Sequence, residues 1–391
     1  MKAVSVGFVG AGFSANLHAE GLKRVFGVPA KPVAVVASSR SRAETFAARH
    51  DIPTVHATYA DLLADPTVDV VCVCVPNTLH EQVIIAAAEA GKHIICEKPL
   101  TGAFGSSGLK GEARAKDERD IARAAVGRIR EAVQRAGIQF MYAENWIYAP
   151  SVTKSKQLLR LAGGAIIDIR AEESHSGSHA VASRRRATAG GGALLVMGAH
   201  PVAAVLHMKA FESSFRSGPR TRVTSVTAET AQIYSSEAVA RLQTKNWTVD
   251  DWEDVETWAN LVMSFSDGTK AVVNASFAML GGVRNVMEIF TTNAVYQNNM
   301  TPNTSLHVFT PDAQAFGQEY LHEKLESRTG WISASPDEDW VRGYPQEMQD
   351  FMEAVANGRE PVSGLQLASD VVDVIYAAYL SAERGSRVAL A

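Results

Sequence analysis

Two glycines follow directly on the first apolar run of the chain. Val4 to Val9 lead into Gly10-Ala11-Gly12-Phe13-Ser14-Ala15, and a stretch of helical spacing runs from His18 to Val25. The glycines allow a tight turn and a close approach of the backbone to a ligand, and a helix N-terminus presents free N–H groups. This strand–turn–helix pattern is typical of sites that bind the pyrophosphate of a dinucleotide, with a plain glycine turn as the alternative. The residues predicted to contact the dinucleotide here are Gly10, Gly12, Phe13 and Ser14.

The end of the second predicted strand, Val33 to Ala37, bears on the form of the dinucleotide. Folds that prefer NAD usually place an acidic residue there to hold the ribose hydroxyls. The chain instead has Ser38, Ser39 and Arg40, followed by a further serine and arginine. These groups suit a 2′-phosphate because arginine pairs with phosphate oxygens through two hydrogen bonds. The sequence slightly favours NADP, while NAD stays open and a solvated, capped helix start is the alternative.

Glu97 and Lys98 stand at the end of another predicted strand, His93 to Cys96. Charged side chains are poor occupants of a buried strand, so we expect them at its carboxyl end, where an open α/β sheet forms its ligand crevice. A lysine in such a crevice acts as a base if burial lowers its pKa. The segment Glu144 to Pro150 follows the predicted strand Ile138 to Ala143 and is expected to face the same crevice.

The elements between these segments predict how they are positioned. Val68 to Val75 is apolar without interruption, which is typical of a parallel strand covered on both faces. Helical segments, Arg42 to His50 and His80 to Ala90, alternate with the strands. Alternating strands and helices joined by short links predict a doubly wound parallel sheet.

Length and composition set further bounds. With 391 residues the chain has room for two or three domains at about 150 residues each. The net charge of -4 argues against nucleic acid or an anionic membrane as partner, and no apolar run approaches the ~20 residues of a membrane helix. The N-terminal apolar run lacks a convincing signal-peptide cleavage site and is better explained as a strand.

Three cysteines lie in strand-like runs, Cys72, Cys74 and Cys96. They are interpreted as buried reduced thiols rather than a metal or redox pair, which predicts a cytoplasmic enzyme.

Four motifs in order resemble the Gfo/Idh/MocA oxidoreductases, named for glucose-fructose oxidoreductase and inositol dehydrogenase. They are Gly10-x-Gly12-x-x-Ala15, Pro76-Asn77-x-x-His80, Gly91-Lys92-His93 and Glu97-Lys98-Pro99. The resemblance implies an α/β protein with a Rossmann domain, residues 1–146, and a C-terminal α/β domain, residues 147–391, built on a large, mostly antiparallel open sheet. It implies a nicotinamide cofactor, sugar or polyol substrates, and a homodimer or homotetramer joined through that sheet. Lys98 would be the catalytic lysine, with a cis bond to Pro99 as an option, and the further residues placed at the cofactor are Pro76, Asn77, His80, Glu97, Lys98 and Asn145.

Gly190 to Pro201 resembles the family's second catalytic motif, in which an aspartate precedes a histidine by one helical turn. The chain has the histidine, His200, but Val196 where the aspartate belongs. A valine can neither orient an imidazole nor hydrogen-bond a hydroxyl. Either another group, such as Glu144 or Glu173, replaces the carboxylate, or the reaction differs from simple alcohol oxidation.

Further polar residues are candidates for substrate binding. The run Glu172 to His179 could ligate a metal, but the resemblance implies none, and no metal is predicted. Three consecutive arginines, Arg184 to Arg186, could hold an anionic substituent of the substrate, although a solvated basic loop is the better interpretation. The substrate candidates are Glu144, Trp146, Tyr148, Glu173, His175, His179, Arg185 and His200.

Other segments complete the prediction. Residues 103–120 are interpreted as an extra exposed loop before a helix from Ile121 to Ala136. A hairpin is expected at Thr257 to Phe277 and further strands at Met287 to Thr292 and Ser305 to Phe309. Two helices are expected near the end, Gln346 to Asn357 and Leu365 to Glu383.

Three functions fit these observations. The leading hypothesis is an NAD(P)-dependent oxidoreductase that transfers a hydride between the nicotinamide and a hydroxyl carbon of a sugar, glycoside or polyol. The second is an NAD-dependent glycosidase that works by transient oxidation, elimination, water addition and re-reduction; the missing aspartate motivates it. The third is a non-catalytic regulator that binds a dinucleotide.

Overall fold

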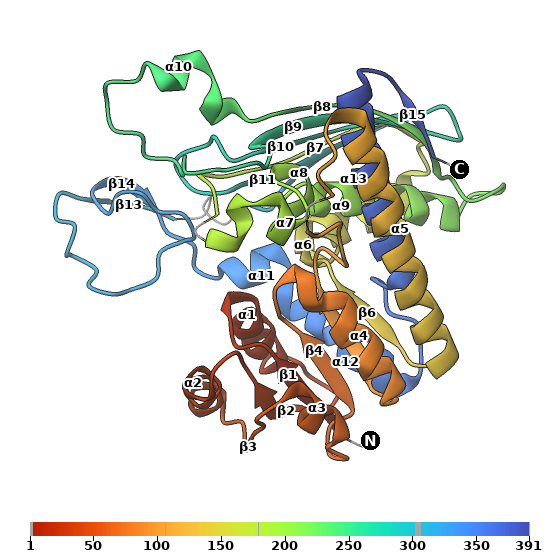
Figure 1. The fold of residues 1–391 in the computed structure, drawn as a ribbon, viewed down its shortest axis with the longest axis vertical. Coiled ribbons are helices and arrows are strands. Elements are labelled where there is room, and N and C mark those ends of the chain that lie inside the picture. The colour runs from red at the N-terminus through yellow and green to blue at the C-terminus, as the bar shows by residue number, and fades with distance from the viewer. Residues whose placement is uncertain (1–2, 106, 179, 302–305, 391) are drawn as a thin grey trace. The chain divides into compact units, whose positions relative to one another are not determined.

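The computed structural model describes residues 3–105, 107–178, 180–301 and 306–390, and Figure 1 shows its elements. The chain forms two compact units. Unit 1 comprises residues 1–102, 120–148 and 343–372, and unit 2 comprises residues 103–119, 149–342 and 373–391. Two of the boundaries fall inside long helices, α5 (Gly111–Ala136) and α13 (Leu365–Arg384).

Unit 1 is built on a six-stranded parallel sheet with the order β3-β2-β1-β4-β5-β6. This order is typical of dinucleotide-binding folds and confirms the predicted doubly wound sheet. β4 is buried at every position and β1 at every position except Ser5, because both lie in the middle of the sheet with strands on both sides. The strands are β1 (Val4–Val9), β2 (Ala30–Val36), β3 (Thr54–Val55), β4 (Val70–Val73), β5 (His93–Glu97) and β6 (Phe140–Ala143). The helices are α1 (Phe13–Leu22), α2 (Arg40–His50), α3 (Tyr59–Ala64), α4 (His80–Glu89) and α12 (Tyr344–Asn357).

The helix α12, more than 200 residues beyond β6, packs in unit 1 against α1. A Cβ atom at Gly21 of α1 would lie 2.9 Å from Cγ of Met348, so the two helices approach closely because residue 21 has no side chain. Met348 and Phe351 are fully buried in the same core as Phe8 of β1. The observed division therefore differs from the predicted boundary at residue 146, since a late segment of the chain completes the first core.

Unit 2 contains a seven-stranded sheet with the order β12-β11-β7-β10-β9-β8-β15. All neighbours are antiparallel except β7 and β10, which confirms the predicted large, mostly antiparallel sheet and its hairpin, β9–β10. Helices α6, α8 and α9 pack against strands of this sheet. The strands are β7 (Ile166–Ser174), β8 (Val223–Ala231), β9 (Trp258–Phe265), β10 (Lys270–Ser276), β11 (Arg284–Thr291), β12 (Val295–Asn299) and β15 (Val388–Ala389). The helices are α6 (Pro150–Ala162), α7 (Arg186–Ala189), α8 (Ala193–Val196), α9 (Ala199–Ser214), α10 (Glu237–Ala240) and α11 (Glu338–Arg342).

Two predictions of secondary structure need correction. The strand expected at Ser305 to Phe309 is β13 (His307–Thr310), and it pairs with β14 (Gly330–Ser333) in a small separate sheet; Ser305 itself lies outside the described residues. The charged stretch 111–120, predicted as part of a loop, is the first part of α5. Its charges have partners: Arg114 pairs with Glu118 one turn later, at 3.8 Å, and with Glu383 of α13.

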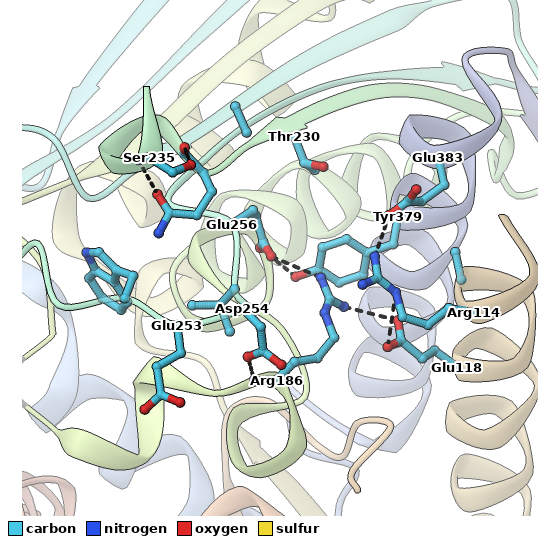
Figure 2. Close-up of a pocket in the computed structure, with 15 residues that line it drawn as sticks. Arg114, Glu118, Arg186, Thr230, Ser235, Glu253, Asp254, Glu256, Tyr379 and Glu383 are labelled. Atoms are coloured by element: carbon cyan, nitrogen blue, oxygen red, sulfur yellow. Dashed lines mark hydrogen bonds and ion pairs between the residues drawn. The ribbon is translucent and has the colours of Figure 1, made fainter. Parts of the chain in front are cut away.

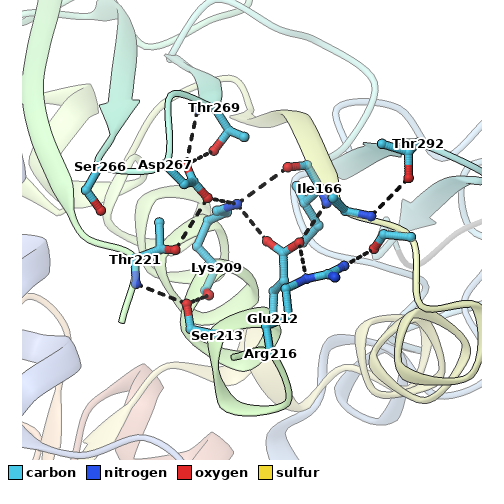
Figure 3. Close-up of polar contacts among 12 residues, drawn as sticks. Ile166, Lys209, Glu212, Ser213, Arg216, Thr221, Ser266, Asp267, Thr269 and Thr292 are labelled. Atoms are coloured by element: carbon cyan, nitrogen blue, oxygen red, sulfur yellow. Dashed lines mark hydrogen bonds and ion pairs between the residues drawn. The ribbon is translucent and has the colours of Figure 1, made fainter. Parts of the chain in front are cut away.

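A buried lysine links helix α9 to the turn between β9 and β10 (Figure 3). Lys209 of α9 is 1% exposed, and its Nζ lies 2.6 Å from Oε2 of Glu212 and 2.8 Å from Oδ2 of Asp267 in the β9–β10 turn. A buried cation is stable only when anions of this kind surround it. Partial burial raises the pKa of Asp267, but hydrogen bonds from Lys209 and Thr269 outweigh burial and lower the pKa to about 2.

This depressed pKa predicts a pH-dependent stability. The folded Asp267 binds a proton less readily than the unfolded one, so its contribution is present above about pH 4 and is lost as the pH falls toward about 2. Asp267→Asn should therefore lower the free energy of unfolding by about 1 kcal/mol near neutral pH, after a discount for solvent screening. Urea unfolding from pH 7 to pH 2 measures the difference, which should shrink toward zero at the acid end. A difference that stays constant over this range would contradict the assignment.

Within the described ranges, no individual helix combines the length and apolar character that crossing a bilayer requires. One bent pair, residues 186–196 and 199–214, meets the requirement by length and composition alone, with a bend of 50°.

Candidate active site

The predicted dinucleotide turn has the required geometry. Gly10 has φ +114°, and a Cβ atom there would lie 2.2 Å from the carbonyl oxygen of Cys74, so only glycine fits. Gly12 is the N-cap of α1 and has no side chain to cap the first N–H groups of the helix. Phe13 and Ser14 begin α1, and Phe13 is largely exposed. Backbone free of side chains at a helix N-terminus fits a pyrophosphate, so these residues fit the implied dinucleotide.

The residues after β2 include a helix cap, Ser39, and an exposed arginine, Arg40. The Ser39 hydroxyl accepts a hydrogen bond from the backbone N–H of Arg42 at 3.4 Å and caps α2, as the alternative interpretation expected. Arg40 is exposed at the first position of α2, and its Nε donates to Oε1 of Glu44 at 2.7 Å. Arg40 therefore begins α2 two residues after Ser38, and its guanidinium is paired with Glu44.

His80 links two segments of unit 1. Its Nδ1 lies 2.9 Å from the carbonyl oxygen of Pro99 and its Nε2 lies 3.0 Å from that of Val75. Burial lowers the pKa of His80, and a neutral imidazole donates only one of these two hydrogen bonds. Both ring nitrogens thus lie within hydrogen-bond distance of main-chain carbonyls, so His80 links the segments that follow β4 and β5. Pro76 and Asn77 lie on one of them, immediately after Val75.

Glu97 and Lys98 stand where β5 ends, as predicted. Glu97 accepts a hydrogen bond from His18 of α1, with 2.8 Å between Nε2 and Oε1, and its Oε2 accepts from the N–H of Lys98 at 3.1 Å. Lys98 is half-buried, and its bond to Pro99 is cis. His18 was missed by the sequence analysis; its only signal was a polar residue on a helix that directly follows the glycine turn.

Glu347 of α12 is a second residue that the sequence analysis missed. It is 1% exposed, and burial, together with the charges of Glu97 and Glu144, raises its pKa well above the ordinary value. Its carboxyl group accepts a hydrogen bond from the backbone of Glu144, and the Glu144 side chain accepts one from the N–H of Trp146 at 3.3 Å. The raised pKa favours the protonated form of this carboxyl group, which lies beside the ends of β5 and β6. The sequence clue to Glu347 was its position on the same face of α12 as the apolar residues Met348 and Phe351.

The residues after Glu144 are buried in unit 1. Asn145, Trp146 and Tyr148 lie in one turn of 3-10 helix. The Tyr148 hydroxyl donates to Oδ2 of Asp350 at 2.7 Å and accepts from the N–H of Ser363 at 3.0 Å. These two bonds give Tyr148 a packing role, and its contact with substrate stays a prediction.

In unit 2, His200 lies in the first turn of α9 and is 6% exposed. Val196 is the last residue of α8, and Met197 and Gly198 separate the two helices. The two positions therefore do not share a continuous helix, which differs from the one-turn relationship expected from the motif.

The glycines before α8 are held by Glu256. Its carboxylate accepts hydrogen bonds from the N–H groups of Gly192, at 2.9 and 3.0 Å, and Leu194, at 3.0 Å. A Cβ atom at Gly192 would lie 1.9 Å from the Glu256 carbonyl oxygen, and one at Gly191 would lie 2.2 Å from the Tyr379 hydroxyl. Glycine is required here because other parts of unit 2 approach the backbone so closely. Glu256 was not singled out by the sequence analysis, since nothing local distinguishes it from its acidic neighbours.

Glu256 also borders a cavity of about 410 Å³ (Figure 2). Its carboxylate accepts from the Tyr379 hydroxyl at 2.7 Å and pairs with Arg186 at 3.3 Å, and Arg186 pairs with Glu118 at 3.0 Å. The guanidinium of Arg186 lies over the Tyr379 ring, 4.8 Å from its centre. These contacts connect α5, α7 and α13 with the glycine turn that precedes α8.

The three consecutive arginines are all paired, which corrects the expectation of a solvated basic loop. Arg184 is buried and pairs with Asp251 at 2.6 Å. Arg185 is exposed and pairs with Glu253 at 2.7 Å. Arg186 is buried between Glu118 and Glu256. Internal ion pairs, rather than an anionic substituent of the substrate, therefore account for the run of three arginines.

Glu173 and His175 lie at the end of β7 and just after it, and both are buried. The Nδ1 of His175 accepts a hydrogen bond from the N–H of Gly177 at 2.9 Å, and its ring contacts Phe277. His179 lies outside the described residues. The part of the chain that the structure covers has no cluster of three or more His, Cys, Asp or Glu that could hold a metal ion.

Family comparisons agree with this architecture. The model of the family described as "Oxidoreductase family, NAD-binding Rossmann fold" matches residues 4–108, and that described as "GFO/IDH/MocA C-terminal domain" matches residues 153–297. The two matches cover more than half of the chain. The chain belongs to the Gfo/Idh/MocA oxidoreductase family. The predicted resemblance is thereby confirmed.

Two relatives of this Gfo/Idh/MocA member are named as carbohydrate dehydrogenases. A D-xylose 1-dehydrogenase (NADP(+)) of Haloferax volcanii is 24% identical over 360 residues, which are 91% of this chain and 91% of the relative. A levoglucosan dehydrogenase of Pseudarthrobacter phenanthrenivorans is 31% identical over 177 residues, 44% of this chain and only 40% of the relative. The crystal structure of GenD2 from gentamicin A biosynthesis, in complex with NAD, superposes with a TM-score of 0.80 at 25% identity, over 100% of this chain and 97% of GenD2.

Proposed function

We propose that this protein is an NAD(P)-dependent oxidoreductase that transfers a hydride between the nicotinamide and a hydroxyl carbon of a sugar, glycoside or polyol. The observation that carries the proposal is in unit 1. The sheet that forms the glycine turn after β1 also delivers Lys98 at the carboxyl end of β5, two strands away. Family membership and the names of the dehydrogenase relatives support the substrate class.

A bound nicotinamide would accept the hydride, and the protein has to remove the hydroxyl proton. Lys98 is proposed as the base that takes this proton. Glu97 orients the segment, since its carboxylate binds both the N–H of Lys98 and the ring of His18. His200 of unit 2 is proposed as the second catalytic group.

The carboxylate missing at position 196 leaves a role to fill. We propose Glu144 and Glu173 as the candidates, because each is a buried acid at the end of a strand, β6 in unit 1 and β7 in unit 2. Asn145, which follows Glu144, is proposed to contact the cofactor.

A direct assay tests the function. NAD and NADP are each offered with a panel of aldoses, polyols and glycosides, and the absorbance of the reduced nicotinamide is followed. We expect net reduction with at least one carbohydrate. Release of the aglycone from a glycoside without net reduction would instead identify redox-neutral cleavage, and the absence of both across the panel would overturn the proposal.

The cofactor is proposed to be NADP, with Ser38, Ser39 and Arg40 at its 2′-phosphate. Arg40→Ala removes a charge-assisted hydrogen bond worth about 1.5–3 kcal/mol, so we expect the Kd for NADP to rise roughly tenfold or more while the Kd for NAD changes little. Titration of the cofactor by fluorescence measures both constants. Equal weakening of the two cofactors, or none, would contradict a role in reading the 2′-phosphate. Arg49→Ala, at the other end of the same helix, is the matched control.

We propose that the sheet of unit 2 also joins subunits. Outward positions on its strands include exposed apolar residues, Ile167 on β7, Val262 on β9 and Val295 on β12. Apolar side chains spread over one sheet face favour a partner surface. Light scattering of the protein should give the mass of a dimer or tetramer, and a monomer at micromolar concentration would contradict this.

A further inference from the structure

Two thiols and a histidine lie in contact within unit 1. Cys72 is in β4 and Cys74 follows that strand directly, so their side chains project on the same side, with 3.6 Å between the two Sγ atoms. The Nδ1 of His18 lies 3.6 Å from Sγ of Cys72. Cys72 is buried, whereas Cys74 is partly exposed. Part of Cys74 therefore reaches solvent, while Cys72 lies fully inside unit 1.

The imidazole of His18 is oriented by a carboxylate. Its second nitrogen, Nε2, lies 2.8 Å from Oε1 of Glu97. Burial alone would lower the pKa of His18, but the Cys74 thiolate and Glu97 outweigh burial and raise the pKa to about 10. The imidazole contacts the sulfur of Cys72, which in turn contacts the sulfur of Cys74, so a positive charge on His18 stabilises a thiolate of this pair, the reactive form of cysteine.

The environments of the two thiols differ. A hydrogen bond from the Cys72 thiol, the charge of His18 and a hydrogen bond from Ser14 lower the pKa of Cys74, against the effect of burial. Burial raises the pKa of Cys72 well above the ordinary value. Cys96 is buried, and burial likewise raises its pKa. Cys74 is the one of the three cysteines that is partly exposed, so it is the thiol that a small oxidant reaches first, and the buried Cys96 serves as a reference.

We propose that Cys74 is a modification site for peroxides, with Cys72 as its resolving thiol. The Cys74 thiolate attacks one oxygen of hydrogen peroxide, the O–O bond breaks, and hydroxide leaves and becomes water on protonation. The product is a sulfenic acid at Cys74. The Cys72 thiol then attacks this sulfur and a second water leaves. In total two thiols and one peroxide give one disulfide and two waters, so sulfur is oxidised and peroxide is reduced.

The position of Cys74 couples this chemistry to the dinucleotide turn. Its carbonyl oxygen is the atom that a Cβ at Gly10 would strike, and its backbone N–H donates to Val9 of β1 at 2.9 Å. A new bond between the sulfurs pulls on the backbone that packs against Gly10. Oxidation is therefore expected to weaken dinucleotide binding about tenfold or more. This consequence, unlike the sulfur chemistry, rests on the proposed function.

Mass spectrometry of the full chain after brief exposure to hydrogen peroxide tests the proposal. The wild type should lose two hydrogen atoms, with Cys72 and Cys74 joined in one peptide, and a reductant should reverse the change. Cys72→Ser should instead accumulate a sulfenic acid at Cys74 that a dimedone reagent traps. Cys74→Ser should not react, and Cys96→Ser, the matched control, should react as the wild type does.

Two further measurements separate the possible failures. Iodoacetamide should alkylate Cys74 at least tenfold faster than Cys96, and His18→Gln should reduce this ratio. Equal rates, or oxidation that does not involve Cys74, would overturn the proposal. The Kd for NAD and NADP is measured separately on reduced and oxidised protein. Oxidation at Cys74 with an unchanged Kd would overturn only the coupling to dinucleotide binding. No binding of either cofactor in either state would instead contradict the proposed function.

Discussion

Lys98→Met is expected to reduce hydride transfer by about 10²–10⁴-fold while the cofactor still binds. The methionine keeps the length of the side chain but cannot take a proton. Because β5 and the glycine turn after β1 are separate elements of the same sheet, the turn should keep its geometry. The measurement is kcat for the carbohydrate found in the substrate panel, together with the Kd of the cofactor by fluorescence.

Lys98→Arg distinguishes a base from a simple positive charge. Arginine retains the charge but cannot lose its proton near neutral pH. If Lys98 is the base, the arginine variant should be nearly as inactive as the methionine variant. Substantial activity of Lys98→Arg would show that the charge alone matters and would contradict the proposed proton transfer.

Glu256→Ala is expected to lower the free energy of unfolding by about 3–5 kcal/mol, because removing one partner leaves Arg186 buried with an incomplete set of anions. Two N–H groups of the glycine turn and the Tyr379 hydroxyl also lose their acceptor. Since the turn leads directly into α8 and α9, kcat should fall as well, through a shift of His200. Denaturant unfolding measures the first effect and steady-state kinetics the second.

Two variants serve as references for Glu256. Glu253→Gln removes the exposed pair with Arg185 in the same loop and should cost no more than about 1 kcal/mol. Tyr379→Phe removes one hydrogen bond to Glu256 and should cost about 1 kcal/mol. If Glu256→Ala cost no more than these references, the carboxylate would not be the centre of the network.

Local sequence patterns predicted most of the helices and strands. The predictions were wrong where charged residues pair with residues that are distant in the sequence. The stretch 111–120 was expected to be a loop because its residues are so polar. It is helical, and Glu118 and Arg114 face Arg186 and Glu383, which are distant in sequence. The run Arg184 to Arg186 failed for the same reason, since its acidic partners lie about 70 residues away.

Sequence alone determined the alternation of strands and helices in unit 1, the dinucleotide turn at Gly10, the ends of β5 and β6, and the family. These features follow from hydrophobic period, glycine spacing and short motifs, which act over a few neighbouring residues. Only the tertiary structure decided that α12 completes the first core, that Glu256 holds the second glycine turn, and that His18 lies between Glu97 and the thiol of Cys72. Each of these joins segments far apart in the chain, and the free energy of such a contact depends on burial and on a partner that local sequence does not specify.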